Sequence, residues 1–378
     1  MNIAIVCYAT SGGSGVVATE LGMQLAKRGH KIHFISSEVP FRLIGPWKKN
    51  IYYHEVDTFD YPLFEEPPYD LALATKIYQV VSQNNIDVIH SHYAVPHSVS
   101  AYLAQQMALA NKQNVGTITT LHGTDVSIVG DEPTLRDVVA FALSKSDVVT
   151  SVSQAMASEA EDKYSLNKKV QVIYNFVNIQ PPAKTPEDLK DVFGANDSNI
   201  ITHISNFRQV KRIEDVIRVF NKINKKVDSK LLLIGDGPEQ RAAHKLAVKL
   251  NVSNKIHFLG LQSSIEKLLA ISDLFLLPSE KENFSLSALE AMSCGVPVIA
   301  TQVGGMAEMI DNGKDGYLFD VGDIDGMAEA GIKLLDDKDS YKKISAAAQK
   351  KAKEGFSPEI IVPQYEKLYE SVIKNHRS

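Results

Sequence analysis

The chain has 378 residues, of which 44% are hydrophobic and 22% charged, and a formal net charge of −5. This length allows two sizeable cores, and the composition is ordinary for a globular protein. The acidic balance argues against nucleic acid as a partner, and no apolar run is long enough to predict a membrane span. The N-terminus lacks the features of a signal peptide, and the two cysteines, Cys7 and Cys294, are expected to be reduced. We therefore expect a cytoplasmic protein.

Apolar runs and helical patterns alternate through the first half of the chain. Strands are expected at residues 3–8, 31–36, 86–91, 115–121, 147–151 and 169–174, and helices at 16–28, 69–83 and 96–111. The segment 41–68 is rich in proline and aromatic residues and is expected to be irregular. The alternation predicts an α/β fold, with a parallel sheet that has helices on both faces.

A glycine-rich turn, Thr10-Ser-Gly-Gly-Ser-Gly, separates the first strand from the first helix. Such a turn can bind anions, because its backbone N–H groups are open to close approach. A dinucleotide site is disfavoured, since the Gly-x-Gly-x-x-Gly spacing is absent and only Glu38 lies near the end of the second strand.

Polar residues also end later strands of this half. His90-Ser-His-Tyr93 contains a pair of histidines on one strand face, but no further ligands cluster nearby, so no metal site is expected. Thr120 and His122 share a face in Thr-Leu-His-Gly-Thr-Asp. Because open α/β sheets bind ligands beyond the carboxyl ends of their strands, these side chains are candidates for a binding site.

Residues 180–188, Gln-Pro-Pro-Ala-Lys-Thr-Pro-Glu-Asp, predict a linker between two domains. A second α/β run follows, with strands expected at 199–204, 231–234, 256–259, 271–277, 296–300 and 316–319 and helices at 213–224, 323–335 and 339–354. Helical spacing of apolar residues from Ser357 onward predicts a last helix.

Two charged motifs stand out in this half. Arg208 and Lys211 precede the helix at 213–224, where cations oppose the helix dipole, so a bound anion is indicated. Glu282 is expected at a turn into a helix from about Asn283, and Glu290 lies two turns on. Ionised carboxylates at that spacing can accept hydrogen bonds from a pair of hydroxyls, although two acids on a solvated helix face would look the same.

The stretch Ser279-Glu-x-Glu-Asn-Phe-Ser-Leu-x-x-Leu-Glu-Ala-Met-x-x-Gly-x-Pro-Val resembles the nucleotide-sugar motif of the retaining GT-B glycosyltransferases of family four. The glycine turn, His-Gly-Thr-Asp and Arg-x-x-Lys follow the family's order along nearly the whole chain. The resemblance implies two Rossmann-like domains facing a cleft. Residues 1–180 would form the acceptor side, 181–355 the nucleotide-sugar side, and 356–378 a helix returning to the first domain.

The resemblance also implies roles for single residues. Glu282 would contact sugar hydroxyls, Glu290 the ribose, and His122 the transferred sugar, while Arg208 and Lys211 would hold the diphosphate without a metal cofactor. The implied catalytic residues are His122, Arg208, Lys211 and Glu282. The implied donor-binding residues are Gly12, Gly13, Asn206, Arg208, Lys211, Glu282, Asn283, Phe284, Ser285, Leu286 and Glu290. We expect a small anionic acceptor to bind Ser14, Tyr93, Thr120 and Asn175.

Two local motifs, Cys-Tyr-x-Thr-Ser-Gly-Gly-Ser-Gly and His-Ser-His-Tyr-Ala-x-Pro-His, resemble the branch of the family that serves bacillithiol biosynthesis. That likeness implies transfer of N-acetylglucosamine from UDP-GlcNAc to the hydroxyl of L-malate, the first step of the pathway. Three alternatives stay open: a related UDP-sugar transferase with another small acceptor, a GT-B sugar-nucleotide epimerase, and a nucleotide-sugar sensor without activity. The oligomeric state, including a homo-oligomer, is also open.

Overall fold

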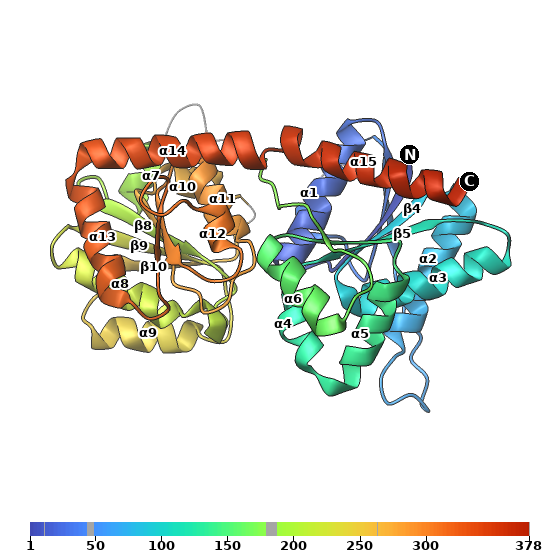
Figure 1. The fold of residues 1–378 in the computed structure, drawn as a ribbon. Coiled ribbons are helices and arrows are strands. Elements are labelled where there is room, and N and C mark those ends of the chain that lie inside the picture. The colour runs from blue at the N-terminus through green and yellow to red at the C-terminus, as the bar shows by residue number, and fades with distance from the viewer. Residues whose placement is uncertain (11, 44–48, 179–186, 263, 378) are drawn as a thin grey trace. The chain divides into compact units, whose positions relative to one another are not determined.

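The computed structural model describes residues 1–377 except positions 11, 44–48, 179–186 and 263 (Figure 1). The chain forms two compact units, one of Met1–Asn175 with Pro358–Ser378 and the other of Phe176–Ser357. The first domain break, expected at 180, and most of the expected linker lie outside the described residues.

The described residues of the first unit form a seven-stranded parallel sheet in the order β3-β2-β1-β4-β5-β6-β7. Its strands are β1 (Asn2–Val6), β2 (Lys31–Ser36), β3 (Ile51–Glu55), β4 (Val88–His92), β5 (Gly116–Leu121), β6 (Val148–Ser151) and β7 (Gln171–Val172). Its helices are α1 (Gly13–Lys27), α2 (Tyr69–Asn84), α3 (Val99–Ala110), α4 (Thr124–Ser127), α5 (Pro133–Lys145), α6 (Gln154–Tyr164) and α15 (Pro358–Arg377), with single turns η1 (Phe41–Leu43), η2 (Ala94–Ser98) and η3 (Val129–Asp131).

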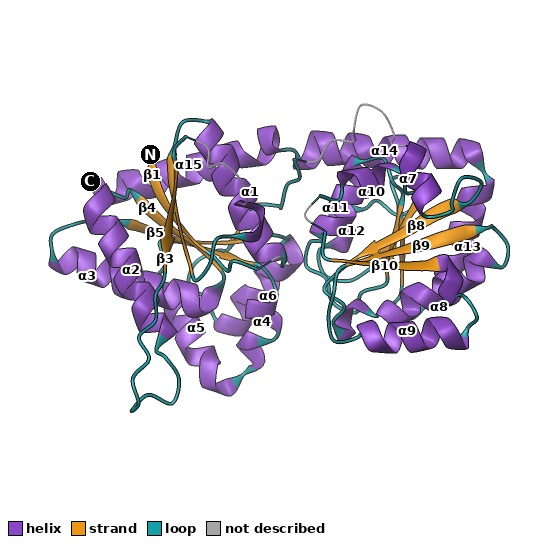
Figure 2. Cartoon of the chain, turned by 180° about the vertical axis from the view of Figure 1, so that it is seen from behind, coloured by secondary structure: helices purple, strands orange, loops and turns teal. Residues whose placement is uncertain are grey.

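Helices cover both faces of this sheet, as the alternating pattern predicts (Figure 2). Buried apolar residues of α2 and α3 pack on one face against Ala4, Val6 and Ile89. On the other face α15 packs across β4 and β5, where the absence of a side chain at Gly116 makes room for Val372. The returning C-terminal helix expected from the fold is therefore an integral part of the first unit.

The described residues of the second unit form a six-stranded parallel sheet in the order β10-β9-β8-β11-β12-β13. Its strands are β8 (Asn199–Ile204), β9 (Ser229–Ile234), β10 (Ile256–Gly260), β11 (Leu274–Leu277), β12 (Val298–Thr301) and β13 (Tyr317–Phe319). Its helices are α7 (Glu187–Val192), α8 (Ile213–Asn224), α9 (Gln240–Lys249), α10 (Glu266–Ala270), α11 (Leu286–Ser293), α12 (Met306–Met309), α13 (Ile324–Asp336) and α14 (Lys338–Phe356), with turns η4 (Gln209–Lys211) and η5 (Ser253–Lys255).

The amphipathic pattern of α8 shows how this core forms. Ile213, Val216, Ile217 and Phe220 recur at helical spacing, and all four are buried against strands β8 and β9 and helix α13. The helices α8 and α9 lie on one face of the sheet, and α10, α11 and α14 on the other (Figure 1).

Two sequence expectations need correction. Segment 41–68 is not wholly irregular, because Ile51–Glu55 forms β3, which pairs in parallel with β2. It is an edge strand with only Ile51 buried, so it lacks the apolar run that marks an inner strand. The helix expected from about Asn283 begins at Leu286, where the Ser285 hydroxyl caps it by accepting the Ala288 N–H at 3.3 Å.

None of the helices in the described part of the chain combines the length and the apolar character needed to cross a membrane.

Candidate functional site

The charged motifs of the second unit follow two neighbouring strands. Arg208 and Lys211 come after β8, Glu282 comes after β11, and these strands pair in parallel. The Glu280 N–H donates to the carbonyl of Val210 at 2.8 Å, so the two loops are also bonded to each other. The fold therefore places both motifs at one edge of the sheet.

An ion pair joins the two loops. The Lys211 Nζ lies 2.5 Å from Oε2 of Glu282, and the two side chains are only 20% and 12% exposed. Neither charge is fully solvated, so each orients the other more strongly than a surface pair would. A cation and a carboxylate thus lie side by side at this edge of the sheet.

A glycine supports the backbone beneath Glu282. Gly304, which follows β12, has a φ of +51°, and a Cβ built on it would lie 2.1 Å from the carbonyl oxygen of Glu282. Any residue with a Cβ at position 304 would force the Glu282 loop to move.

Arg208 and Asn206 lie in the same loop after β8, and both are exposed. Among the described residues, the Arg208 guanidinium makes no hydrogen bond or ion pair. Its five N–H donors are therefore available to an anion that reaches this edge of the sheet.

The remaining candidates of the second unit lie just before α11 or within it. Because that helix begins at Leu286, Glu282 precedes it and does not share a helix face with Glu290, which is 4% exposed within it. Phe284 is buried and its ring meets Phe356 edge-on, with ring centroids 5.3 Å apart. Its side chain therefore packs the core, and a contact with nucleotide through Phe284 stays a prediction.

In the first unit, the glycine turn leads directly into a 15-residue helix. Gly12 is the N-cap of α1, and Gly13 and Ser14 form its first turn. A Cβ on Gly15 would lie 2.6 Å from the carbonyl oxygens of both Tyr8 and Thr10. Gly15, which the sequence analysis did not single out, therefore lets the helix start close to the first strand.

His122 follows β5, and its loop is held by a carboxylate. Asp125 accepts hydrogen bonds from the backbone N–H groups of His122 at 3.1 Å, Gly123 at 2.7 Å and Ala94 at 3.3 Å. Burial raises the pKa of Asp125 to about 6, although these N–H donors act in the opposite direction. The Asp of His-Gly-Thr-Asp thus shapes the loop rather than facing a ligand, a role that short-range sequence pattern does not reveal.

Buried histidines surround this loop. Nδ1 of His92 lies 3.0 Å from Nε2 of His122, and His90 bonds Tyr369 of α15 at 2.8 Å and Thr120 at 2.7 Å. Burial lowers the pKa of His90 and of His122 to about 3 and that of His92 well below its usual value. These imidazoles are therefore neutral at pH 7.

The structure places the acceptor candidates at the carboxyl ends of several strands. Tyr93 follows β4 with a φ of 108°, a strained backbone for a residue other than glycine, and its hydroxyl bonds that of Thr124. Asn175 follows β7 and is buried. The Thr120 hydroxyl is fully buried and bonds His90 and Thr150, so its contact with a substrate stays a prediction.

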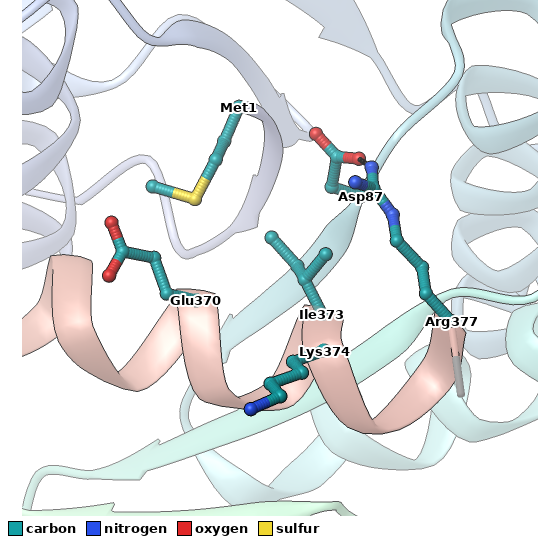
Figure 3. A pocket seen from close by; sticks show the side chains of 6 residues that line it. All are labelled: Met1, Asp87, Glu370, Ile373, Lys374 and Arg377. Carbon is teal, nitrogen blue, oxygen red and sulfur yellow. Dashed lines mark hydrogen bonds and ion pairs between the residues drawn. The ribbon is translucent and has the colours of Figure 1, made fainter.

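A surface pocket of about 540 Å³ lies elsewhere, between Met1, Asp87 and α15 (Figure 3). Met1 and Asp87 precede β1 and β4, so this pocket is at the amino ends of the strands, opposite the candidate residues. We do not assign this pocket as the functional site on its size alone, because parallel α/β sheets bind ligands at the carboxyl ends of their strands. No group of three or more metal-ligating side chains occurs among the described residues.

Two family models match the chain, one for each half. The model described as Glycosyltransferase Family 4 covers residues 11–181, and Glycosyl transferases group 1 covers residues 185–351. N-acetyl-alpha-D-glucosaminyl L-malate synthase of Bacillus anthracis is 46% identical over 380 residues, covering 100% of this chain and 99% of that protein. The chain belongs to the family-four glycosyltransferases.

Solved structures of glycosyltransferases share the fold. A glycosyltransferase of Rickettsia africae ESF-5 superposes with a TM-score of 0.81 at 24% identity, covering 99% of both chains. The Anabaena HepE protein, solved with UDP-glucose, gives 0.82 at 20% identity over 98% of this chain and 100% of that one. The two parallel-sheet units are thus the two Rossmann-like domains of a GT-B glycosyltransferase, an enzyme that uses a nucleotide-sugar donor.

Proposed function

We propose that this protein transfers N-acetylglucosamine from UDP-GlcNAc to the hydroxyl of L-malate with retention of the α-anomer, the first step of bacillithiol biosynthesis. The observation that carries the proposal is the 46% identity, over the full length, to an enzyme named for that synthesis. The identity of the acceptor is the most specific claim of the proposal, and it rests most directly on this relative.

The charged loops of the second domain suit the donor. When the sugar–phosphate bond breaks, negative charge develops on the diphosphate, and cations fixed beside it stabilise the transition state. Arg208, with no side-chain partner among the described residues, and Lys211 would supply that charge. Glu282 beside Lys211 would accept hydrogen bonds from sugar hydroxyls, and Glu290 from the ribose.

No metal cofactor enters this proposal. Arg208, Lys211 and the N–H groups at the start of α1 would carry the stabilising charge instead. The leaving phosphate oxygen would take the proton of the incoming malate hydroxyl on the same sugar face, which gives retention. Catalysis then depends on positioning and electrostatics, and no side chain is assigned as general base.

The test is to incubate the purified protein with UDP-GlcNAc and L-malate and follow products by mass spectrometry. We expect UDP and a GlcNAc–malate adduct, with α-linkage in the proton NMR spectrum and undiminished activity in EDTA. A β-linked product contradicts retention, and loss of activity in EDTA contradicts metal independence.

Reactions that lack one component separate the alternatives. Isomerisation of the donor without malate would indicate an epimerase, and binding without turnover across an acceptor panel would indicate a sensor. A faster reaction with UDP-glucose, or with an acceptor other than malate, would assign a different transferase activity.

A further inference from the structure

We propose that His92 is a positioning residue that holds His122 in the tautomer with its hydrogen on Nδ1. The consequence for turnover rests on the proposed function, whereas the tautomer can be measured without any substrate. The assignment follows from the buried environment of His92 and from the partners of its two ring nitrogens.

The two imidazoles contact each other across neighbouring strands. His92 ends β4, and His122 follows β5, the strand paired with it. Nδ1 of His92 lies 3.0 Å from Nε2 of His122. His92 is completely buried, while His122 is partly exposed at the carboxyl edge of the sheet. A fixed histidine therefore lies directly behind one that a ligand can reach.

A bond between two ring nitrogens contains a single hydrogen. Burial lowers the pKa of both rings, so both are neutral and each carries one N–H. If the shared hydrogen belongs to Nδ1 of His92, then Nε2 of His122 is the acceptor and the hydrogen of His122 must be on Nδ1. If it belongs to Nε2 of His122, the hydrogen of His92 must be on its own Nε2.

The second nitrogen of His92 decides between these arrangements. Its Nε2 is buried and has no hydrogen-bond partner within the described part of the chain. A hydrogen there would be a buried donor without an acceptor, whereas the other arrangement leaves a buried lone pair without a donor, and orphaned N–H groups are the rarer of the two in proteins. The hydrogen of His92 is therefore on Nδ1, and it is donated to His122.

A neighbouring histidine shows the same arrangement. Nδ1 of His97 lies 2.7 Å from the carbonyl oxygen of His92, which can only accept, so His97 carries its hydrogen on Nδ1. Its Nε2 is likewise buried without a partner among the described residues. The bond also fixes the backbone of His92, while the ring of His90 packs against His92 with centroids 4.2 Å apart.

The consequence concerns what His122 offers a ligand. With Nε2 occupied by His92, the partly exposed ring presents Nδ1–H as a hydrogen-bond donor. Within the described residues, that nitrogen has no hydrogen-bond partner. A sugar hydroxyl oxygen can accept from it, whereas the other tautomer would offer only a lone pair. His92 thus determines whether His122 donates or accepts a hydrogen bond at its exposed nitrogen.

The experiment uses the full-length protein labelled with ¹⁵N-histidine. Long-range ¹H–¹⁵N spectra distinguish the two tautomers, and the signals lost in His122→Gln identify His122. We expect the Nδ1–H form in the wild type. A His122 with its hydrogen on Nε2 overturns the proposal, and the tautomer itself is read from the spectrum of the wild-type protein.

Two variants of His92 then test its role. His92→Asn keeps an amide donor near the position of Nδ1 and should preserve both the tautomer and most of the turnover. His92→Phe keeps a ring without a nitrogen, so His122 should populate both tautomers, and kcat should fall about tenfold or more. An unchanged tautomer in His92→Phe overturns the proposal.

His33→Asn is the matched control. His33 is also buried and also bonds a histidine, since its Nδ1 lies 2.9 Å from Nε2 of His54, but this pair is on the outer strands β2 and β3. The His33→Asn substitution should leave the His122 signals and kcat unchanged. If wild-type protein makes no product from UDP-GlcNAc and L-malate, the proposed function fails, while the spectra still decide the positioning role.

Discussion

The ammonium of Lys211 and the carboxylate of Glu282 form an ion pair at 2.5 Å, although 71 positions separate them in the chain. The pair exists because β8 and β11 are neighbours in the sheet, and both residues follow the carboxyl ends of those strands. A ligand with a phosphate and nearby hydroxyls would find both partners already oriented, which lowers the cost of assembling the site.

Replacing Lys211 by alanine should lower kcat about a hundredfold or more, because a fixed cation at the developing charge of the diphosphate is lost. Steady-state kinetics with UDP-GlcNAc and L-malate measures the effect, and thermal unfolding checks that the variant is folded. Lys222→Ala is the control. Its Nζ pairs with Asp325 at the same 2.5 Å, but on an exposed surface of α8 and α13, so it should turn over normally. Near-wild-type turnover of Lys211→Ala would remove Lys211 from the mechanism.

Gly304→Ala should impair turnover through the backbone of Glu282. The new Cβ would be 2.1 Å from the Glu282 carbonyl oxygen, so the loop must move and Glu282 shifts away from its position beside Lys211. Gly313→Ala is a matched control, because its φ is +77° but a Cβ there meets nothing within 4 Å. Both variants should lose about 1 kcal/mol of stability from the positive φ. Only Gly304→Ala should also lose activity. Equal kinetics in the two variants would contradict the close contact at Gly304.

What the sequence could predict of this edge of the sheet, and what it could not, has physical reasons. Lys211 and Glu282 could be singled out because charged residues follow apolar strands, but their pairing depends on strand order, which no local pattern contains. Likewise, the bond between His92 and His122 arises only when β4 and β5 pair, so no local pattern around either histidine predicts it. The edge strand β3 was missed because exposed polar and aromatic positions give it no apolar run.

Buried neutral histidines should make the first domain sensitive to acid. The pKa of His90 and of His122 is about 3 and that of His97 about 4, whereas all three return to about 6.5 on unfolding. The unfolded state therefore takes up protons first as the pH falls below 6.5. Each histidine contributes stability that is complete above that pH and declines by up to about 1.4 kcal/mol per pH unit until its folded pKa is reached.

Other titratable groups determine how much the two domains differ in the stability they lose on acidification. Asp125, whose pKa is raised to about 6, acts with the opposite sign, because its contribution is complete below about 3.8 and is lost as the pH rises through 6. It offsets only one of the three histidines. In the second domain burial lowers the pKa of His203 to about 4 and also lowers the pKa of the less buried His257. Urea titrations at pH 7.5 and 5.0, read for each domain by pulsed hydrogen exchange, should show the larger loss in the first domain. Equal losses would contradict this assignment.

The acceptor prediction concerns the first turn of α1 and the strained residue after β4. Ser14 lies at the positive end of a 15-residue helix, and Tyr93, directly after β4, has a φ of 108°. A pocket that donates hydrogen bonds to both carboxylates of malate leaves donors unpaired when one carboxylate is missing. L-malate should therefore exceed L-lactate in kcat/KM by about a hundredfold or more, measured as UDP release under identical donor concentrations.

Variants locate that pocket. Ser14→Ala and Tyr93→Phe each remove one hydroxyl, so the KM for malate should rise while the KM for UDP-GlcNAc stays nearly constant, because the lost contact involves only the acceptor. Tyr93→Phe also breaks the hydroxyl bond to Thr124, and a thermal unfolding measurement separates this structural cost from binding. Ser158→Ala, on an exposed position of α6, should change neither constant. If lactate is used as efficiently as malate, the acceptor binds elsewhere. If both variants raise only the KM for UDP-GlcNAc, these two residues belong to the donor site.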